Sequence, residues 1–125
     1  MNIVIQTIPH KSHRYPTVGD FLHRRGVDTI LVSDMHNDSY ALLVGLHELV
    51  EMTLCRKAGV SFRAITAFDK AYEKARKPGD LSEPGDSRKA PYFRQHQVAT
   101  KIEKQMCKAL GIKWAEYNAK VESLP

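Results

Sequence analysis

Hydrophobic and polar residues follow two different periods along the chain, strand-like near the N-terminus and helical in the remainder. Residues 3–8 (IVIQTI) and 29–33 (TILVS) are rich in β-branched side chains, which predicts two short strands. The simplest arrangement pairs these strands antiparallel, as in a hairpin. Residues 9–19 between them contain two prolines and a glycine, which predicts a long loop or an irregular edge.

The remainder of the chain shows the 3.6-residue period of helices in four segments. We expect helices at residues 40–58, 61–76, 91–110 and 113–123. Asp38 or Ser39 is suited to cap the first helix, Gly59 to end it and Ser61 to cap the second. Residues 77–90 contain few apolar residues and the similar tetrapeptides KPGD and EPGD, which predicts a surface loop or lid.

These elements predict an α+β fold in which short N-terminal antiparallel strands pack against three to four helices. At 125 residues with 42% hydrophobic residues, the chain is long enough for one core and too short for two. We therefore expect a single domain over residues 1–125, with the strands and loop in 1–37 and the helices in 38–125.

Composition bounds the environment and the partners of the protein. No stretch approaches the roughly 20 apolar residues that cross a bilayer, and the N-terminus lacks a secretion signal, so we expect a cytoplasmic protein without a membrane partner. Cys55 and Cys107 each lie in a helical segment, which fits a reducing compartment. The net charge of +5 is spread over several segments, and its densest patch, residues 10–25, lacks the pattern of a base-stacking platform. Nucleic acid is therefore not favoured as a partner.

The strongest chemical signal lies in the first predicted helix. Between residues 42 and 55, almost every residue is apolar except His47, Glu48, Glu51 and Thr53. At about 100° per residue, His47 and Glu51 lie about 40° apart around the helix, and Glu48 lies about 60° beyond Glu51. Apolar residues bracket this face one turn before and one turn after, and buried carboxylates are costly unless they are paired or bind a cation. The pattern indicates the floor of a pocket.

The third predicted helix also turns ionisable groups inward. His96 and Glu103 fall inside its apolar arc, whereas its lysines fall outside. If the two helices pack together, His96 faces His47 and Glu51, and two imidazoles with one carboxylate suit zinc or another divalent first-row ion. A fourth position left to water favours hydrolysis, with Glu48 as the general base.

The HELVE segment at 47–51, on a helix that follows a short strand, resembles the HExxH helix of zincin metallopeptidases, with glutamate in place of the second histidine. The resemblance implies that His47 is a zinc ligand, Glu48 the general base and Glu51 a substitute ligand. His96 is the later ligand by position only. The implied function is a metal-dependent hydrolase of peptide or amide substrates.

Most of the chain also resembles small phage- and prophage-encoded proteins of uncharacterised function. The segments that carry this resemblance are RYPTVGD at 14–20, HELVE at 47–51, AFD at 67–69 and PYFRQH at 91–96. It implies the cytoplasm of a bacterial host and a partner that is either a substrate or a host protein, and it supplies no activity.

Three other interpretations of the same residues stay open at this point. A polar patch in which Glu51 pairs with a basic residue explains the first helix without a metal. Glu48 and Glu51 also form an ExxE motif that resembles the magnesium site of all-α nucleotide pyrophosphohydrolases, although the second helix lacks a clear ExxD and the N-terminal strands do not suit that fold. A phage-type accessory or inhibitor protein would instead use a metal to hold its helices together.

Four further features are secondary candidates. Glu103 lies two helical turns from His96, so we expect it to form a buried ion pair or to orient a ligand. We expect Asp69 at the solvated surface, with support of a ligand as the alternative. His36 is the reserve ligand, and the 14–20 stretch has the composition of a functional loop.

Overall fold

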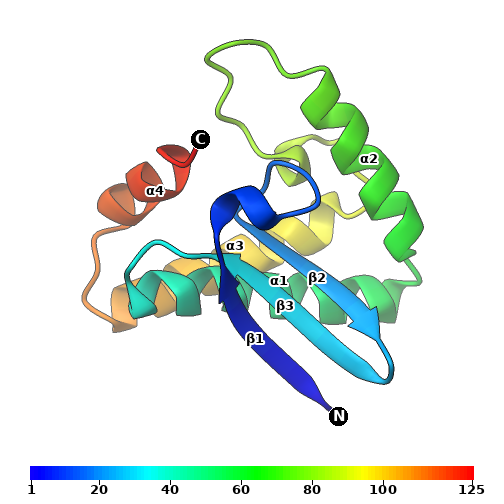
Figure 1. The fold of residues 1–125 in the computed structure, drawn as a ribbon, viewed down its shortest axis with the longest axis horizontal. Helices are drawn as coiled ribbons and strands as arrows, with labels where there is room; N and C mark the ends of the chain where they lie inside the picture. Colours follow the sequence, from blue (N-terminus) through cyan, green and yellow to red (C-terminus); the bar gives the residue numbers. More distant parts are fainter.

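The computed structural model describes residues 1–125 and consists of a small sheet followed by four helices (Figure 1). The strands are β1 (Ile3–Ile8), β2 (Gly19–Arg24) and β3 (Val27–Ser33), and the helices are α1 (Asp38–Ala58), α2 (Phe62–Lys74), α3 (Phe93–Ala109) and α4 (Trp114–Glu122). The predicted α+β class is confirmed. None of these helices has the length and apolar character needed to cross a lipid bilayer.

The three strands form a mixed sheet in the order β1-β3-β2. β2 runs antiparallel to β3, and Phe21 lies opposite Ile30, whereas β1 runs parallel to β3, and Ile5 lies opposite the other side of Ile30. The predicted antiparallel pairing of residues 3–8 with 29–33 is therefore wrong. β2 takes the hairpin position through Arg25 and Gly26, whose φ angles of 51° and 76° are those of a type I′ turn.

The helix ends follow local hydrogen bonding. Asn37, rather than Asp38 or Ser39, caps α1, because its side-chain oxygen accepts from the Tyr40 N–H at 3.0 Å. Gly59 ends α1 with φ of 74°, a conformation that a side chain disfavours. The predicted cap of α2 is also confirmed, since the hydroxyl of Ser61 accepts from the next turn.

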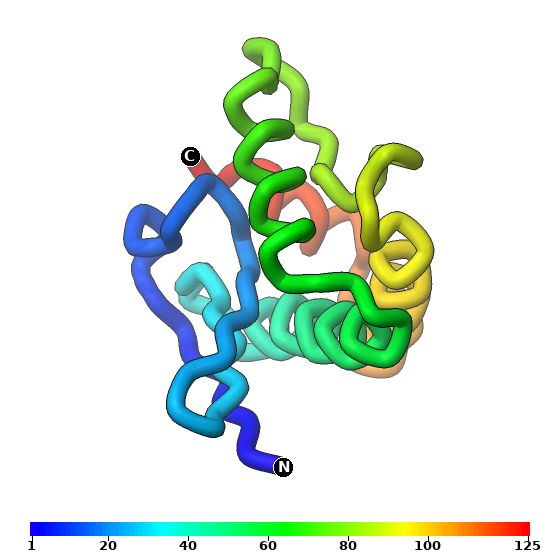
Figure 2. The backbone as a smooth tube through the Cα atoms, turned by 90° about the vertical axis from the view of Figure 1, so that its right-hand side faces the viewer, coloured from blue at the N-terminus to red at the C-terminus, as the bar shows by residue number.

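Helix α1 lies across one face of the sheet, and α3 runs beside α1 in the opposite direction (Figures 1 and 2). Helix α2 extends away from the C-terminal end of α1, and α4 contacts α3 (Figure 1). Large fully buried side chains come from the sheet, α1 and α4, and include Ile30, Val32, Leu43, Met52 and Tyr117. Burying each of these large side chains stabilises the fold by about 1.5–3 kcal/mol. Because α1 is covered on two sides, side chains on its α3 face are buried even where they are charged.

The 77–90 segment is only partly the surface loop that its composition predicts. Leu81 is 59% exposed, but the chain then turns back, and Gly85 and Ala90 are buried. Gly85 lies in a short 3₁₀ turn, Pro84–Asp86, where an added Cβ would collide with the ring of His96. The turn therefore lies flat against α3, and only glycine permits that approach.

Candidate metal centre

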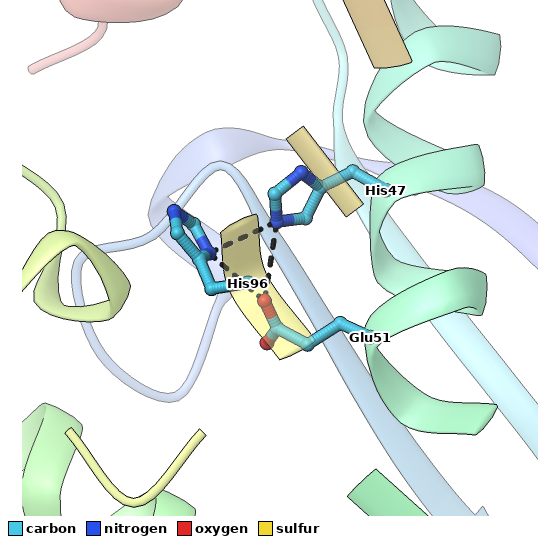
Figure 3. Close-up of side chains that lie close together, drawn as sticks. All are labelled: His47, Glu51 and His96. Atoms are coloured by element: carbon cyan, nitrogen blue, oxygen red, sulfur yellow. Dashed lines mark hydrogen bonds and ion pairs between the residues drawn. The ribbon is translucent and has the colours of Figure 1, made fainter. Parts of the chain in front are cut away.

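His47, Glu51 and His96 meet at one point between α1 and α3 (Figure 3). His47 Nε2 lies 3.2 Å from Glu51 Oε2 and 3.2 Å from His96 Nδ1, and Glu51 Oε2 lies 2.9 Å from His96 Nδ1. All three side chains are buried, with 5–7% of each residue exposed. His47 and Glu51 face the same way because they are one helical turn apart, and the packing of α3 on α1 adds His96.

These three donor atoms fit a tetrahedral metal ion. Zinc lies about 2.0–2.2 Å from imidazole nitrogen and carboxylate oxygen, so two ligands of one ion are about 3.3–3.5 Å apart. The observed separations of 2.9–3.2 Å are slightly shorter than these edges. Two imidazoles and one carboxylate are also a donor set that first-row divalent ions prefer.

The outer nitrogen of His47 is held by a buried carboxylate. His47 Nδ1 lies 2.8 Å from Glu103 Oε1, and the hydroxyl of Tyr117 donates to Glu103 Oε2 at 2.5 Å. When the ring is neutral, a proton on Nδ1 satisfies this contact and leaves the lone pair of Nε2 facing Glu51 and His96. The expectation that Glu103 pairs with or orients a ligand agrees with this geometry.

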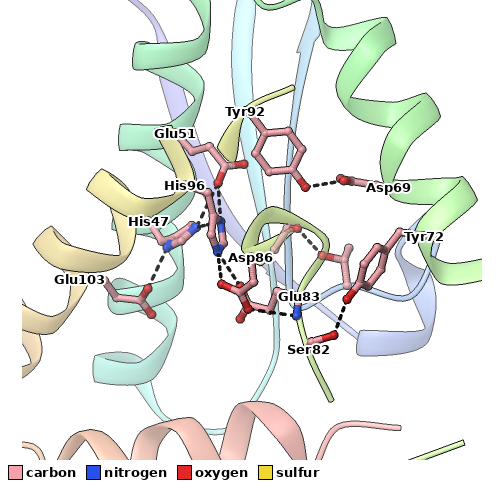
Figure 4. Close-up of polar contacts among 12 residues, drawn as sticks. His47, Glu51, Asp69, Tyr72, Ser82, Glu83, Asp86, Tyr92, His96 and Glu103 are labelled. Atoms are coloured by element: carbon pink, nitrogen blue, oxygen red, sulfur yellow. Dashed lines mark hydrogen bonds and ion pairs between the residues drawn. The ribbon is translucent and has the colours of Figure 1, made fainter. Parts of the chain in front are cut away.

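The outer nitrogen of His96 is held in the same way by residues that sequence reasoning missed. His96 Nε2 lies 3.2 Å from Glu83 Oε2 and 3.3 Å from Asp86 Oδ1, at the two ends of the Pro84–Asp86 turn (Figure 4). Its Nδ1 therefore points to His47 and Glu51. The EPGD segment is a signal for a turn, but nothing in it identifies His96 as its partner.

Hydrogen bonds that the histidines donate to carboxylates control the protonation of this cluster. Burial alone would lower the pKa of His47, but hydrogen bonds to Glu103 and Glu51 raise that pKa to about 10. For His96, hydrogen bonds to Asp86, Glu51 and Glu83 likewise overcome burial and raise the pKa to about 12. Burial opposes ionisation of Glu51, but the two histidines hold its pKa below the usual value. The same atoms therefore bind protons tightly when no metal competes.

Glu48 lies beside this cluster without joining it. Its carboxylate makes no hydrogen bond or ion pair with a protein group, and its Cγ and Oε1 pack against Gly19, where an added Cβ would overlap them. Burial, followed by the charge of Glu51, raises the pKa of Glu48 well above its usual value. A half-buried carboxylate with a raised pKa is suited to accept a proton near neutral pH.

Both the cluster and Glu48 line one large cleft of about 910 Å³. Its walls come from residues 15–21, from α1 and α2, from the 76–86 segment, and from α3, α4 and the C-terminal residues. Clefts of this size bind small molecules or short segments of larger ones. The cluster is therefore in reach of a ligand although its own atoms are buried.

Asp69 is not at the solvated surface, contrary to expectation. It is 8% exposed and accepts a hydrogen bond from the hydroxyl of Tyr92 (Figure 4). It accepts another from the hydroxyl of Tyr15 at 2.9 Å. Burial raises its pKa to about 6, although both hydrogen bonds act in the opposite direction. Asp69 therefore joins the 14–20 stretch to α3 and does not contact the three converging donors.

The two remaining sequence candidates, the 14–20 stretch and His36, lie in different surroundings. The 14–20 stretch is fixed by Arg14, whose Nε donates to Asp20 at 2.6 Å, and residues 15–20 line the cleft. His36 lies outside the cluster: its side chain is 89% exposed and its nearest acidic partner is Asp34, at 3.6 Å. The prediction of His36 as a reserve ligand is therefore wrong.

Comparison of the chain with protein-family models, with curated proteins and with solved structures finds no match.

Proposed function

We propose that His47, Glu51 and His96 bind one divalent transition metal, with zinc as the best fit, and that the protein is a metal-dependent hydrolase of peptide or amide bonds. The observation that carries the proposal is the meeting of three donor atoms within 3.2 Å of one another, while carboxylates hold the outer nitrogen of each histidine. Carboxylate–histidine pairs of this kind fix the tautomer and the ring orientation of metal ligands.

The surroundings of the cluster favour catalysis over a purely structural metal. Structural zinc sites have four protein ligands, whereas catalytic sites have three and leave one position for water or substrate. Here the neighbouring carboxylates of Glu103, Glu83 and Asp86 face the outer nitrogens of the histidines instead of the meeting point. The cluster also forms part of the wall of the 910 Å³ cleft, which has room for a substrate.

The chain supplies the groups that amide hydrolysis needs. A zinc ion at such a site would contribute Lewis-acid chemistry, because zinc acidifies water and polarises a carbonyl. Glu48 would accept the proton of an attacking water at its carboxylate and pass it to the leaving amine. The pKa of Glu48, raised by burial and by Glu51, brings proton uptake closer to neutral pH.

The donor set argues against the magnesium alternative. Magnesium prefers an octahedral shell of oxygen atoms. Glu51, the second glutamate of the ExxE motif, is instead hydrogen-bonded to both His47 and His96. Two imidazoles around that carboxylate suit zinc better.

The first test is elemental analysis of the protein, purified without added metal or a histidine tag. We expect near-stoichiometric zinc or another first-row metal in the native protein, and loss of most of it in His47→Ala and Glu51→Ala. The matched control is His23→Ala, which removes an exposed histidine that pairs with Asp28 outside the cleft. Absence of metal from the native protein, with zinc titration also giving no binding, would contradict the proposal.

The second test separates metal binding from catalysis. Glu48→Gln keeps the size of the side chain and touches none of the three converging donors, so we expect it to retain the metal. Removal of a general base lowers the rate by about 10²–10⁴-fold. Hydrolysis of a mixed peptide library, followed by mass spectrometry, compares this variant with the native protein. Equal hydrolysis by both proteins would exclude Glu48 as the base.

A further inference from the structure

Acidic residues gather in the cleft to an extent that the overall composition hides. The chain has 14 acidic residues and 19 lysines and arginines, for a net charge of +5. Ten of the 14 acidic residues line the cleft, compared with three of the 19 basic ones. The acidic ones are Asp20, Glu48, Glu51, Asp69, Glu73, Asp80, Glu83, Asp86, Glu103 and Glu122. A basic protein thus has an acidic cleft and carries most of its positive charge elsewhere.

Contacts within the protein neutralise only part of this charge. Arginines pair with three of the ten: Arg14 with Asp20, and Arg76 with both Glu73 and, at 3.8 Å, Asp80. Four more face His47 or His96, namely Glu51, Glu83, Glu103 and Asp86. The other three, Glu48, Asp69 and Glu122, have no cationic partner.

One divalent ion does not reverse the sign of the cleft. The lining contains ten acidic side chains and three lysines or arginines, so the two positive charges of the ion leave a formal excess of negative charge when the histidines are counted as neutral. Clefts lined by one sign of charge focus the electric field and raise the local concentration of ligands of opposite charge.

The aromatic part of the lining is compatible with a cation as well. Tyr15, Tyr92, Phe62 and Trp114 line the same cleft. Aromatic faces attract guanidinium and ammonium groups, and the protein itself shows three such contacts on these rings: Arg14 over Tyr15 at 5.0 Å and over Phe62 at 4.7 Å, and Lys104 over Trp114 at 5.1 Å.

We propose that the cleft recognises positively charged ligands, specifically peptide segments that contain arginine or lysine. The inference rests on the proposed function where it treats such a segment as the substrate. Its physical basis, the charge of the cleft, is independent of catalysis. A negatively charged peptide would be repelled from the cleft and attracted to the basic outer surface.

Trp114 provides a direct readout, because it is the only tryptophan and it lines the cleft. We would titrate the protein, zinc-loaded and metal-free, with a capped peptide of alternating arginine and glycine and with its glutamate counterpart. The charge of the cleft is changed in the double variant Asp80→Asn with Glu122→Gln. Asp34→Asn with Glu116→Gln is the matched control, because it changes net charge equally at residues outside the cleft. All four substitutions keep an acceptor oxygen in place.

We expect the arginine peptide to bind and to change the fluorescence of Trp114, and the glutamate peptide to leave it unchanged. Exposed charge pairs are individually weak, so the cleft double variant is expected to weaken binding by about 2–30-fold and the control by less than about twofold. Equal weakening by both double variants, or binding of the glutamate peptide in the cleft, would overturn the proposal. No fluorescence change with the arginine peptide would overturn it too.

Zinc binding and binding of the arginine peptide are measured separately, so the two proposals can fail independently. If zinc binds but the arginine peptide does not, cation recognition fails and the metal proposal stands. If the arginine peptide binds but the protein takes up no metal, the hydrolase proposal fails and the acidic cleft stands as a binding site.

Discussion

Zinc binding is expected to release protons in a number that reflects the hydrogen bonds of the cluster. In the metal-free protein, the pKa of His47 is raised to about 10 and that of His96 to about 12. Near pH 7.5 both rings therefore tend to hold a proton on each nitrogen. Metal binding needs the lone pairs of His47 Nε2 and His96 Nδ1, so the protons on these atoms must leave.

The expected number lies between one and two protons per zinc ion. Two donors 3.2 Å apart cannot form a hydrogen bond with each other, so repulsion between the inner N–H groups of His47 and His96 lowers the total below two. Two histidines with an ordinary pKa of about 6.5 would together release only about 0.2 protons near pH 7.5. Release of at least one proton makes the apparent zinc affinity rise by about tenfold or more per pH unit, or about 1.4 kcal/mol.

Isothermal titration calorimetry measures this release. Zinc is titrated into metal-free protein at one pH in several buffers that differ in ionisation enthalpy, and the slope of the observed enthalpy against that value gives the number of protons. His23→Ala should give the native slope. Zinc binding with fewer than about 0.5 protons released would refute the reasoning that the carboxylates keep these rings protonated.

Substitutions around the histidines and a change of pH are expected to have separable effects. Gly85→Ala pushes a methyl group into the ring of His96 and should lower zinc affinity by about 10–100-fold, with Ser87→Ala as the control in a chelator competition assay. Glu103→Ala leaves the polar atoms of its buried partners without a hydrogen bond, so the free energy of unfolding in urea should fall by about 2–5 kcal/mol, compared with less than about 0.5 for Glu116→Ala. In the metal-free protein, the raised histidine pKa values mean that the folded state holds more protons above about pH 6.5. The free energy of unfolding should therefore decrease by on the order of 1 kcal/mol per pH unit between about pH 7 and 9, and an increase would contradict the histidine pKa values.

The helices were predictable because their signals are local. The C-terminal glycine of α1 and the serine cap of α2 act within one or two turns of their own helices, so sequence pattern alone places them. α3 shows the limit of that approach. Val98 is apolar but 44% exposed, whereas the buried stripe contains His96, Ala99, Glu103 and Cys107. A stripe with two ionisable groups does not follow hydrophobic periodicity.

The sheet was harder to predict because strand pairing is not local. β2 has the sequence GDFLHR, in which only Phe21 and Leu22 are apolar, so it shows no alternation. Because β2 is not recognisable as a strand from its sequence, a hairpin between residues 3–8 and 29–33 was the simplest arrangement. The parallel pairing of β1 with β3 depends on where the chain travels between them, through the residues that build the cleft wall.

The placement of His47, Glu48 and Glu51 in one region of an apolar helix follows from sequence alone, because a helix fixes the angle between residues three and four positions apart. Which donors meet depends on how the helices pack. The packing of α3 on α1 places His96 Nδ1 2.9 Å from Glu51, and the return of the chain at Gly85 places Glu83 and Asp86 against the same ring. Contacts between side chains of separate elements have no signature in one sequence, since they depend on how those elements fill a common core.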